Sequence, residues 1–246
     1  MSSDTLNDGA PNAQAAPERV SAETAAAPDN SASDQRVIKE LFFPTPIYFV
    51  DLENSAELNV FLKNRIYSWR DADQTGIQRS NVRSLGSWHS GTVMNQRPEY
   101  RLFVNKVTAA LNVVYQDQLY STAHTAHCLN MWANINPRGG YNRSHTHPGS
   151  LWSGVYYVQA PPDCGRVVFQ DPRAQAQVMQ AHQNSAAKAT GEHWAEVFHQ
   201  AVEGRLILFP SWLRHEVEPN HSALTDRRGD RISISFNYGQ APHITA

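Results

Sequence analysis

The sequence has few cysteines, no long apolar run and little net charge. Its two cysteines, Cys128 and Cys164, are too few for a disulfide framework, so we expect free thiols in a reducing cytoplasm. No run of 18 apolar residues occurs, and no basic region precedes an apolar core at the N-terminus, so neither a transmembrane helix nor a secretory signal is expected. A net charge of -2, without a dense Lys/Arg cluster, predicts neither nucleic acid nor a membrane surface as partner.

Aromatic residues are absent from residues 1–35, which are rich in Ala, Ser, Asp and Asn. Such a segment buries too little apolar surface to offset the entropy lost on ordering, so we expect a disordered tail. The remaining residues, 36–246, have a length that suits one domain. The apolar stretch Val37–Asp51 contains two prolines and predicts an edge strand or an extended arm.

Two helices are predicted ahead of the strand-rich part of the chain. Residues 53–69 carry apolar side chains at helical spacing on one side. Residues 98–120 form the second helix, with Pro98 at an early position and an apolar side that includes Leu102, Val107 and Leu119. His89 lies in the polar stretch between them and is interpreted as a loop histidine, with a role facing the substrate left open.

From about residue 126 to residue 240 the sequence is rich in short strands separated by turns. Strands preceded by helices predict a mainly β fold, a jelly-roll (double-stranded β-helix, cupin-like) barrel with a helical layer. Residues 174–203 differ in composition, and Trp194, Val197, Phe198 and Val202 recur at roughly helical spacing. We expect this segment to be an inserted lid.

The candidate metal ligands are three histidines near predicted strands. His145 and His147 lie one residue apart, and alternate residues of an extended chain point to the same side. His215 follows a second apolar strand and a turn at Pro210. Imidazole is a common ligand of iron, zinc and copper, so the three histidines predict a metal site.

The stretch Arg231–Tyr238 alternates strictly between polar and apolar residues. The simplest interpretation is an antiparallel strand whose polar face meets water. A second interpretation is that the polar face lines a site. Arg231 and Ser233 would then share one face, and a guanidinium beside a hydroxyl is a good clamp for a carboxylate.

These residues together resemble the iron(II)/2-oxoglutarate oxygenase superfamily. The motifs His145-x-His147, His215 and Arg231-x-Ser233 carry the resemblance. The sequence segments around these motifs resemble a bacterial group of 2-oxoglutarate/iron oxygenases, and the resemblance covers residues 128–239. These segments include Phe169-x-Asp171-Pro172-Arg173 and Phe209-Pro210-Ser211-Trp212-Leu213.

The resemblance implies a dioxygenase that uses Fe(II), 2-oxoglutarate and dioxygen, hydroxylates a small molecule or peptide, and releases succinate and carbon dioxide. His145, His147 and His215 would bind the iron, and Arg231 with Ser233 would bind the distal carboxylate of 2-oxoglutarate. The residues expected to line the substrate pocket are Asn134, Asn136, Tyr156, Tyr157 and Asn237.

His147 departs from the pattern of the superfamily, most of which has Asp or Glu at this position. Some members bind iron through two histidines alone. The sequence therefore leaves two alternatives: His147 is the third ligand, or it faces the substrate while water completes the metal site.

Two other functions are compatible with the same residues. Gly204-x5-Pro210 with His215, after the His145–His147 pair, resembles the motifs of a metal-binding cupin, which can act as an enzyme or sensor without 2-oxoglutarate. Leu151 and Trp152 stand where cupins usually have Glu, and a cupin has no need of Arg231-x-Ser233. The third possibility is a binding barrel without turnover. Iron-dependent succinate release from 2-oxoglutarate distinguishes the oxygenase from both.

Overall fold

The computed structural model describes residues 38–80, 85–178 and 194–243. The chain divides into two units, one before Pro44 and one from Pro44 onward. Residues 38–43 are the described part of the first unit and contain no helix or strand. The predicted disordered tail, residues 1–35, lies outside the described residues. None of the described helices has the length and apolar character needed to cross a membrane.

The second unit contains two antiparallel sheets. The strands of the six-stranded sheet are, in spatial order, β1 (Tyr48–Asp51), β8 (Arg205–Pro210), β5 (Trp152–Gln159), β10 (Arg231–Pro242), β3 (His124–Asn136) and β2 (Trp88–His89). Those of the four-stranded sheet are β4 (Asn142–His145), β9 (His215–Val217), β6 (Val167–Gln170) and β7 (Glu196–His199). The fold is the predicted jelly roll, and β1 is the predicted edge strand.

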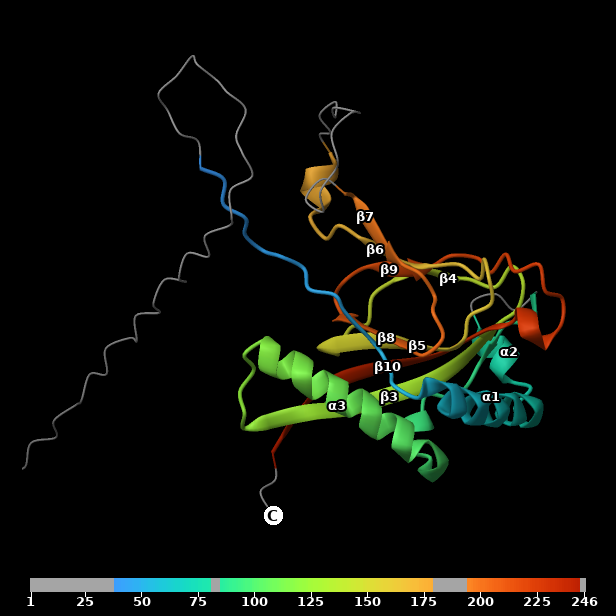
Figure 1. Cartoon of the computed structure of the whole chain (residues 1–246). Coiled ribbons are helices and arrows are strands. Elements are labelled where there is room, and N and C mark those ends of the chain that lie inside the picture. The colour runs from blue at the N-terminus through green and yellow to red at the C-terminus, as the bar shows by residue number, and fades with distance from the viewer. Residues whose placement is uncertain (1–37, 81–84, 179–193, 244–246) are drawn as a thin grey trace, which may run out of the picture. The chain divides into compact units, whose positions relative to one another are not determined.

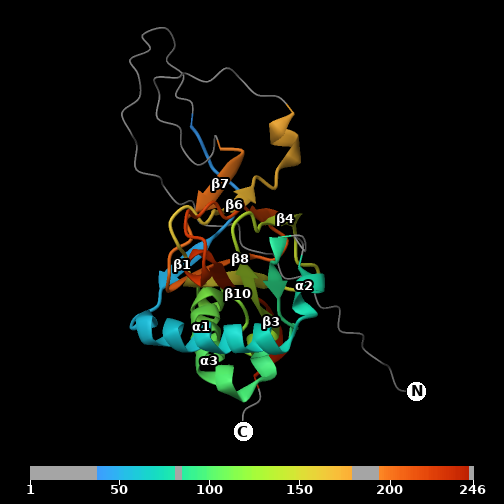
Figure 2. The same cartoon turned by 90° about the vertical axis from the view of Figure 1, so that its right-hand side faces the viewer.

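Two long helices cover one face of the six-stranded sheet, and the four-stranded sheet lies on the other side (Figure 1, Figure 2). They are α1 (Ser55–Ala72) and α3 (Arg101–Asp117), both at predicted positions. The shorter helices are α2 (Gly76–Arg79) and the 3-10 turns Met94–Gln96, Pro98–Tyr100, Ala174–Gln177 and Arg227–Gly229. Each layer shields apolar side chains of the central sheet from water.

The alternation of β10 separates the helical side of the sheet from the side of the site. Ile232, Ile234 and Phe236 are buried in the larger hydrophobic core, which also contains side chains of α1 and α3. Val155 and Phe209 belong to a second core that includes residues of both sheets. The polar face of β10 therefore points away from the helices, toward the four-stranded sheet.

The second helix is shorter than predicted, and two of the residues predicted on its apolar side are exposed. Leu102 and Leu119, predicted on its apolar side, are 65% and 91% exposed. Val107 and Leu111 are buried as predicted, and Phe103 is buried with them, because their spacing of four residues aligns them on the face toward the sheet. The helix ends at Asp117, and Leu119 adopts a positive φ of 54° beyond its end.

The helical spacing noted within residues 174–203 was misleading at residues 196–199. This stretch is β7, which pairs with β6 from Val167↔His199 to Gln170↔Glu196. Val197 and His199 are half-buried and Glu196 and Phe198 exposed, which is the period of a strand. Pairing with β6 overrides the local spacing. The middle of the expected lid, residues 179–193, lies outside the described residues.

Candidate metal centre

Strand pairing brings the three predicted histidines together. His145 ends β4 and His215 begins β9, and the two residues are direct partners in the antiparallel pair. His147 lies two residues beyond β4, where its backbone N–H donates to the carbonyl of Ser211 at 2.9 Å. Ser211 follows directly after β8. The chain is therefore fixed on both sides of the site by backbone hydrogen bonds.

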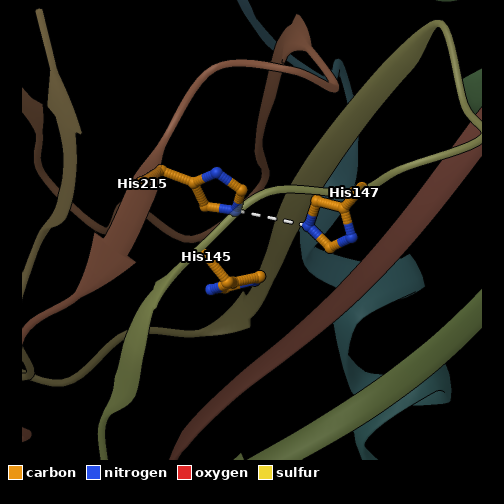
Figure 3. A group of neighbouring side chains, drawn as sticks. All are labelled: His145, His147 and His215. Carbon is orange, nitrogen blue, oxygen red and sulfur yellow. Dashed lines mark hydrogen bonds between the residues drawn. The ribbon is translucent and has the colours of Figure 1, made fainter. Parts of the chain in front are cut away.

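The imidazole rings of His145 and His147, two residues apart on one segment, lie close to the ring of His215 on another segment (Figure 3). One ring nitrogen from each histidine lies within 4.8 Å of the others. The Nε2 atoms of His147 and His215 are 3.3 Å apart. Two nitrogens bound to one ion at about 2.1 Å and at a right angle lie about 3 Å apart. The arrangement therefore fits three imidazoles around a single metal ion.

The second ring nitrogen of two histidines is held by the backbone. Nδ1 of His145 lies 2.6 Å from the carbonyl oxygen of Arg143, and Nδ1 of His215 lies 2.9 Å from that of Leu213. A carbonyl only accepts, so Nδ1 carries the proton and donates in both residues. The lone pair is then on Nε2. Histidines that bind metals are commonly oriented in this way.

Burial keeps two of these rings neutral. It lowers the pKa of His147 to about 4, and the nearby His145 acts in the same direction. Burial and His145 likewise lower the pKa of His215 to about 3. A metal ion binds a neutral imidazole, so it does not have to displace protons from these two residues at neutral pH.

Arg231, predicted to bind a carboxylate, is a buried cation that lines one cavity together with the three histidines. It is 1% exposed. Its guanidinium donates to the backbone carbonyls of Cys164, Glu218 (2.9 Å) and Gly140 (3.2 Å). Within the described parts of the chain no ion pair forms with Arg231. A buried cation without an anionic partner is costly, so this position suits an anionic ligand.

Close packing fixes the position of this guanidinium. A Cβ atom at Gly165 would lie 2.8 Å from Nη1 of Arg231 and 2.5 Å from the carbonyl oxygen of Glu218. Gly165 also has a φ of +87°, a conformation that side-chain-bearing residues rarely adopt. Three of the five N–H groups of Arg231 serve the backbone, which leaves two for a ligand.

Tyr157 contributes a buried hydroxyl without a partner among the described residues. Its side chain lines the cavity together with Arg231 and Ser233. Burial raises the pKa of Tyr157, so the phenol stays protonated and can donate a hydrogen bond. An unpaired buried hydroxyl costs about 1–3 kcal/mol. A carboxylate beside Arg231 would satisfy it.

The three histidines line one cavity with Arg231, Ser233, Asn134 and Tyr157. The expectation for Tyr156 is corrected: its hydroxyl donates to Asn59 of α1 at 2.7 Å, on the helical side of the sheet. Asn136 and Asn237 are buried but do not line the cavity. Asn237 is held by Ser153 (2.7 Å) and donates to Asn130 (2.8 Å).

Asn142 and Trp132 also line the cavity, although neither had a role assigned from the sequence. Asn142 lies on β4 three residues before His145, and Trp132 shares a strand face with Asn134. Trp132 stands between two histidines, with ring centroids 5.9 Å from His147 and 5.6 Å from His89. The sequence could have indicated this role, because Trp132 lies on the same face of an alternating strand as Asn134.

His89, interpreted from the sequence as a loop histidine, is in β2 and stacks on Trp132. It therefore lies beside the cavity wall and not in a free loop.

Comparison with known structures supports the fold. A Pseudomonas putida prolyl-4-hydroxylase is 16% identical with a TM-score of 0.52, and the match covers 78% of this chain and 92% of that one. The α-ketoglutarate dependent epimerase SnoN from nogalamycin biosynthesis is 11% identical with a TM-score of 0.54, covering 79% and 76%. EctD from S. alaskensis is 16% identical with a TM-score of 0.52, covering 79% and 72%.

The sequence comparison agrees with the structural one. No curated protein matches the chain significantly. Residues 130–237 match a family described as "Putative 2OG-Fe(II) oxygenase". The matched region begins in β3 and ends in β10, so it includes all three histidines and the Arg231–Ser233 pair. The similarity to this family therefore covers the strand-rich part of the chain that carries the candidate site.

Proposed function

We propose that the protein is an Fe(II)- and 2-oxoglutarate-dependent dioxygenase that hydroxylates a small molecule or a peptide. One observation carries the proposal: a cluster of three imidazoles and an unpaired buried cation line the same cavity. The first suits a metal ion and the second suits a carboxylate. A ligand with one end on the metal and a carboxylate at the other end meets both requirements.

His145, His147 and His215 would hold the Fe(II). Imidazole suits this ion, and Nδ1 of His145 and His215 already donates to a backbone carbonyl, which leaves Nε2 for the metal. His147 is the proposed third ligand because its Nε2 lies as close to His215 as a shared ion requires. Three neutral ligands would leave coordination positions for 2-oxoglutarate and dioxygen.

Arg231, Ser233 and Tyr157 would hold the distal carboxylate of 2-oxoglutarate. Arg231 would supply charge, and the hydroxyls of Ser233 and Tyr157 would supply hydrogen bonds. Tyr157 strengthens the proposal independently, because its buried hydroxyl has no partner in the described structure. The three side chains belong to two adjacent strands, β5 and β10, in which Tyr157 pairs with Ser233.

Bound iron with 2-oxoglutarate and dioxygen supplies the oxidising power, and 2-oxoglutarate is converted to succinate and carbon dioxide. The protein's own residues position the reactants and restrict water. Hydroxylation is the proposed outcome. Because the structural neighbours include an epimerase as well as a prolyl-4-hydroxylase, analysis of the product must test this part of the proposal.

Iron-dependent turnover of 2-oxoglutarate tests the proposal against the cupin alternative. The purified protein is incubated in air with Fe(II) and 2-oxoglutarate, and succinate is measured. We expect slow release of succinate without added substrate, and none when a chelator replaces the iron. A protein that binds iron but neither binds nor consumes 2-oxoglutarate would be a metal-binding cupin or a sensor instead.

A further inference from the structure

Among the described residues that line the cavity, one side chain is permanently charged, and it is a cation. Arg231 is the charged residue, and the three histidines are neutral when they bind a metal. None of the described lining residues is Asp or Glu. The polar groups that remain include the side-chain amide of Asn142 and that of Asn134, which uses one of its two N–H groups to donate to Ser235 at 3.3 Å. An amide can donate to an anion without adding charge of its own.

Two acidic residues near the site in sequence, Glu218 and Asp230, have partners outside the cavity. The carboxylate of Glu218 forms an ion pair with Arg166, with Nη2 to Oε1 at 2.5 Å, although its backbone carbonyl contacts Arg231. Asp230, the neighbour of Arg231, accepts from the hydroxyl of Tyr67 at 2.8 Å. Asp230 therefore faces α1, on the other side of the sheet. Neither carboxylate lines the cavity.

The summed charge of the metal, Arg231 and bound 2-oxoglutarate is positive. The metal contributes +2 and Arg231 contributes +1, and the 2-oxoglutarate dianion contributes −2, which leaves about one positive charge. The sum is the same if water replaces His147 as the third ligand. A carboxylate at position 147 would bring the sum to zero. Position 147 therefore sets the charge that an incoming substrate meets.

We propose that the substrate of this site bears an anionic group, such as a carboxylate, which binds in the cavity beside the metal and within reach of the amides of Asn134 and Asn142. This inference rests on the proposed function and extends it to a substrate class. An excess charge in a poorly hydrated cavity favours an ion of opposite sign and disfavours a cation. The site therefore selects against substrates whose reacting end is an amine.

The test uses three probes with one carbon skeleton: isobutyrate, isobutyramide and isobutylamine. The protein is loaded with Mn(II), which broadens the proton NMR signals of nearby molecules, and with saturating 2-oxoglutarate under anaerobic conditions. Broadening of the probe methyl signals reports binding close to the metal. We expect isobutyrate to bind at least about tenfold more tightly than either of the other probes.

Two variants connect the preference to position 147. In His147→Asp the excess charge is removed, so the preference for isobutyrate should fall by about tenfold or more. In His147→Gln, a neutral replacement, the preference should persist. Equal binding of the three probes by the wild-type protein, or an unchanged preference in His147→Asp, would overturn the inference.

Equilibrium dialysis with labelled 2-oxoglutarate separates the two proposals. If Mn(II)-loaded protein does not retain 2-oxoglutarate, the proposed function fails. If 2-oxoglutarate is retained and the anionic probe has no advantage, the substrate class alone is wrong.

Discussion

His147 and His215 place their Nε2 atoms 3.3 Å apart although 68 positions separate them in the sequence. The contact is possible because β4 and β9 are neighbours, and because the backbone of His147 is hydrogen-bonded to Ser211 at the end of β8. Because Nδ1 of His215 donates to a backbone carbonyl, its Nε2 can accept a hydrogen bond from Nε2 of His147, and the same two nitrogens can instead bind one metal ion. This pair therefore links the jelly-roll topology to the proposed metal centre.

The third ligand can be tested at His147. If His147 binds iron, His147→Ala should lose affinity for Fe(II) by about tenfold or more, whereas His147→Asp should lose less, because a carboxylate can replace the imidazole. The measurement is competition for Fe(II) with a chromophoric chelator. Equal affinity in the wild-type protein and both variants would leave a site with two histidine ligands.

Arg231 should determine affinity for 2-oxoglutarate. Removing a shielded, charge-assisted contact in Arg231→Ala should weaken 2-oxoglutarate binding by about 2–5 kcal/mol, with Fe(II) binding nearly intact. Arg228→Ala is the matched control, because Arg228 is exposed and pairs with Asp226 at the surface. Loss of iron binding with unchanged 2-oxoglutarate affinity would contradict this role. Calorimetric titration of the iron-loaded proteins supplies both values.

Tyr157 and Tyr156 are adjacent in sequence and should respond in opposite ways to loss of the hydroxyl. Tyr157→Phe removes a buried hydroxyl without a described partner, so the ligand-free protein should be as stable as the wild type or more stable. Its affinity for 2-oxoglutarate should fall by roughly tenfold or more.

Tyr156→Phe loses the hydrogen bond to Asn59 and should cost about 1 kcal/mol of stability, with 2-oxoglutarate binding unchanged. Urea unfolding and 2-oxoglutarate titration of the two variants give the comparison. If Tyr157→Phe binds 2-oxoglutarate as the wild type does, Tyr157 has no part in the carboxylate site.

The thiol of Cys128 should react only at high pH. Burial raises its pKa to about 11. At pH 8 the reactive thiolate is then roughly one thousandth of the total, and the fraction rises about tenfold for each pH unit up to the pKa. Alkylation of the folded protein by iodoacetamide, followed by mass spectrometry, should show this pH dependence at Cys128. Rapid labelling at pH 8 would show that the thiol is accessible and ionised.

The sequence predicted β10 well because its two faces meet different surroundings. Ile232, Ile234 and Phe236 pack on the helical side, whereas Arg231 and Ser233 face the cavity. The difference between the two faces is visible in the sequence as a strict alternation of polar and apolar residues. The histidines were also predictable, since their spacing and the turn at Pro210 are local features.

The roles of Tyr156 and Tyr157 could not be separated in the same way. Every residue of β5 is buried, because α1 covers one face of the strand and the second sheet covers the other. A strand buried on both faces shows no alternation of polarity. Asn237 illustrates a related limit: its partners Ser153 and Asn130 are 84 and 107 positions away, so its polar side chain is satisfied by contacts that only the fold creates.

The strand β7 was mistaken for helix because its local sequence favours no single conformation. Its register with β6 decides the structure, and no residue of the segment itself encodes that pairing. The missed role of Trp132 has a similar cause. Its two histidine neighbours come from β2 and from the chain after β4, both distant in sequence.

Anaerobic titration of the protein with Fe(II) and then 2-oxoglutarate tests the central claim most directly. When Fe(II) and 2-oxoglutarate both occupy the proposed site, a weak visible charge-transfer band should develop. The band should saturate at one equivalent of Fe(II) and one equivalent of 2-oxoglutarate. The band should be absent in His215→Ala, which removes a metal ligand, and should require much more 2-oxoglutarate in Arg231→Ala. A wild-type protein that binds Fe(II) tightly and develops no band with 2-oxoglutarate would contradict the account.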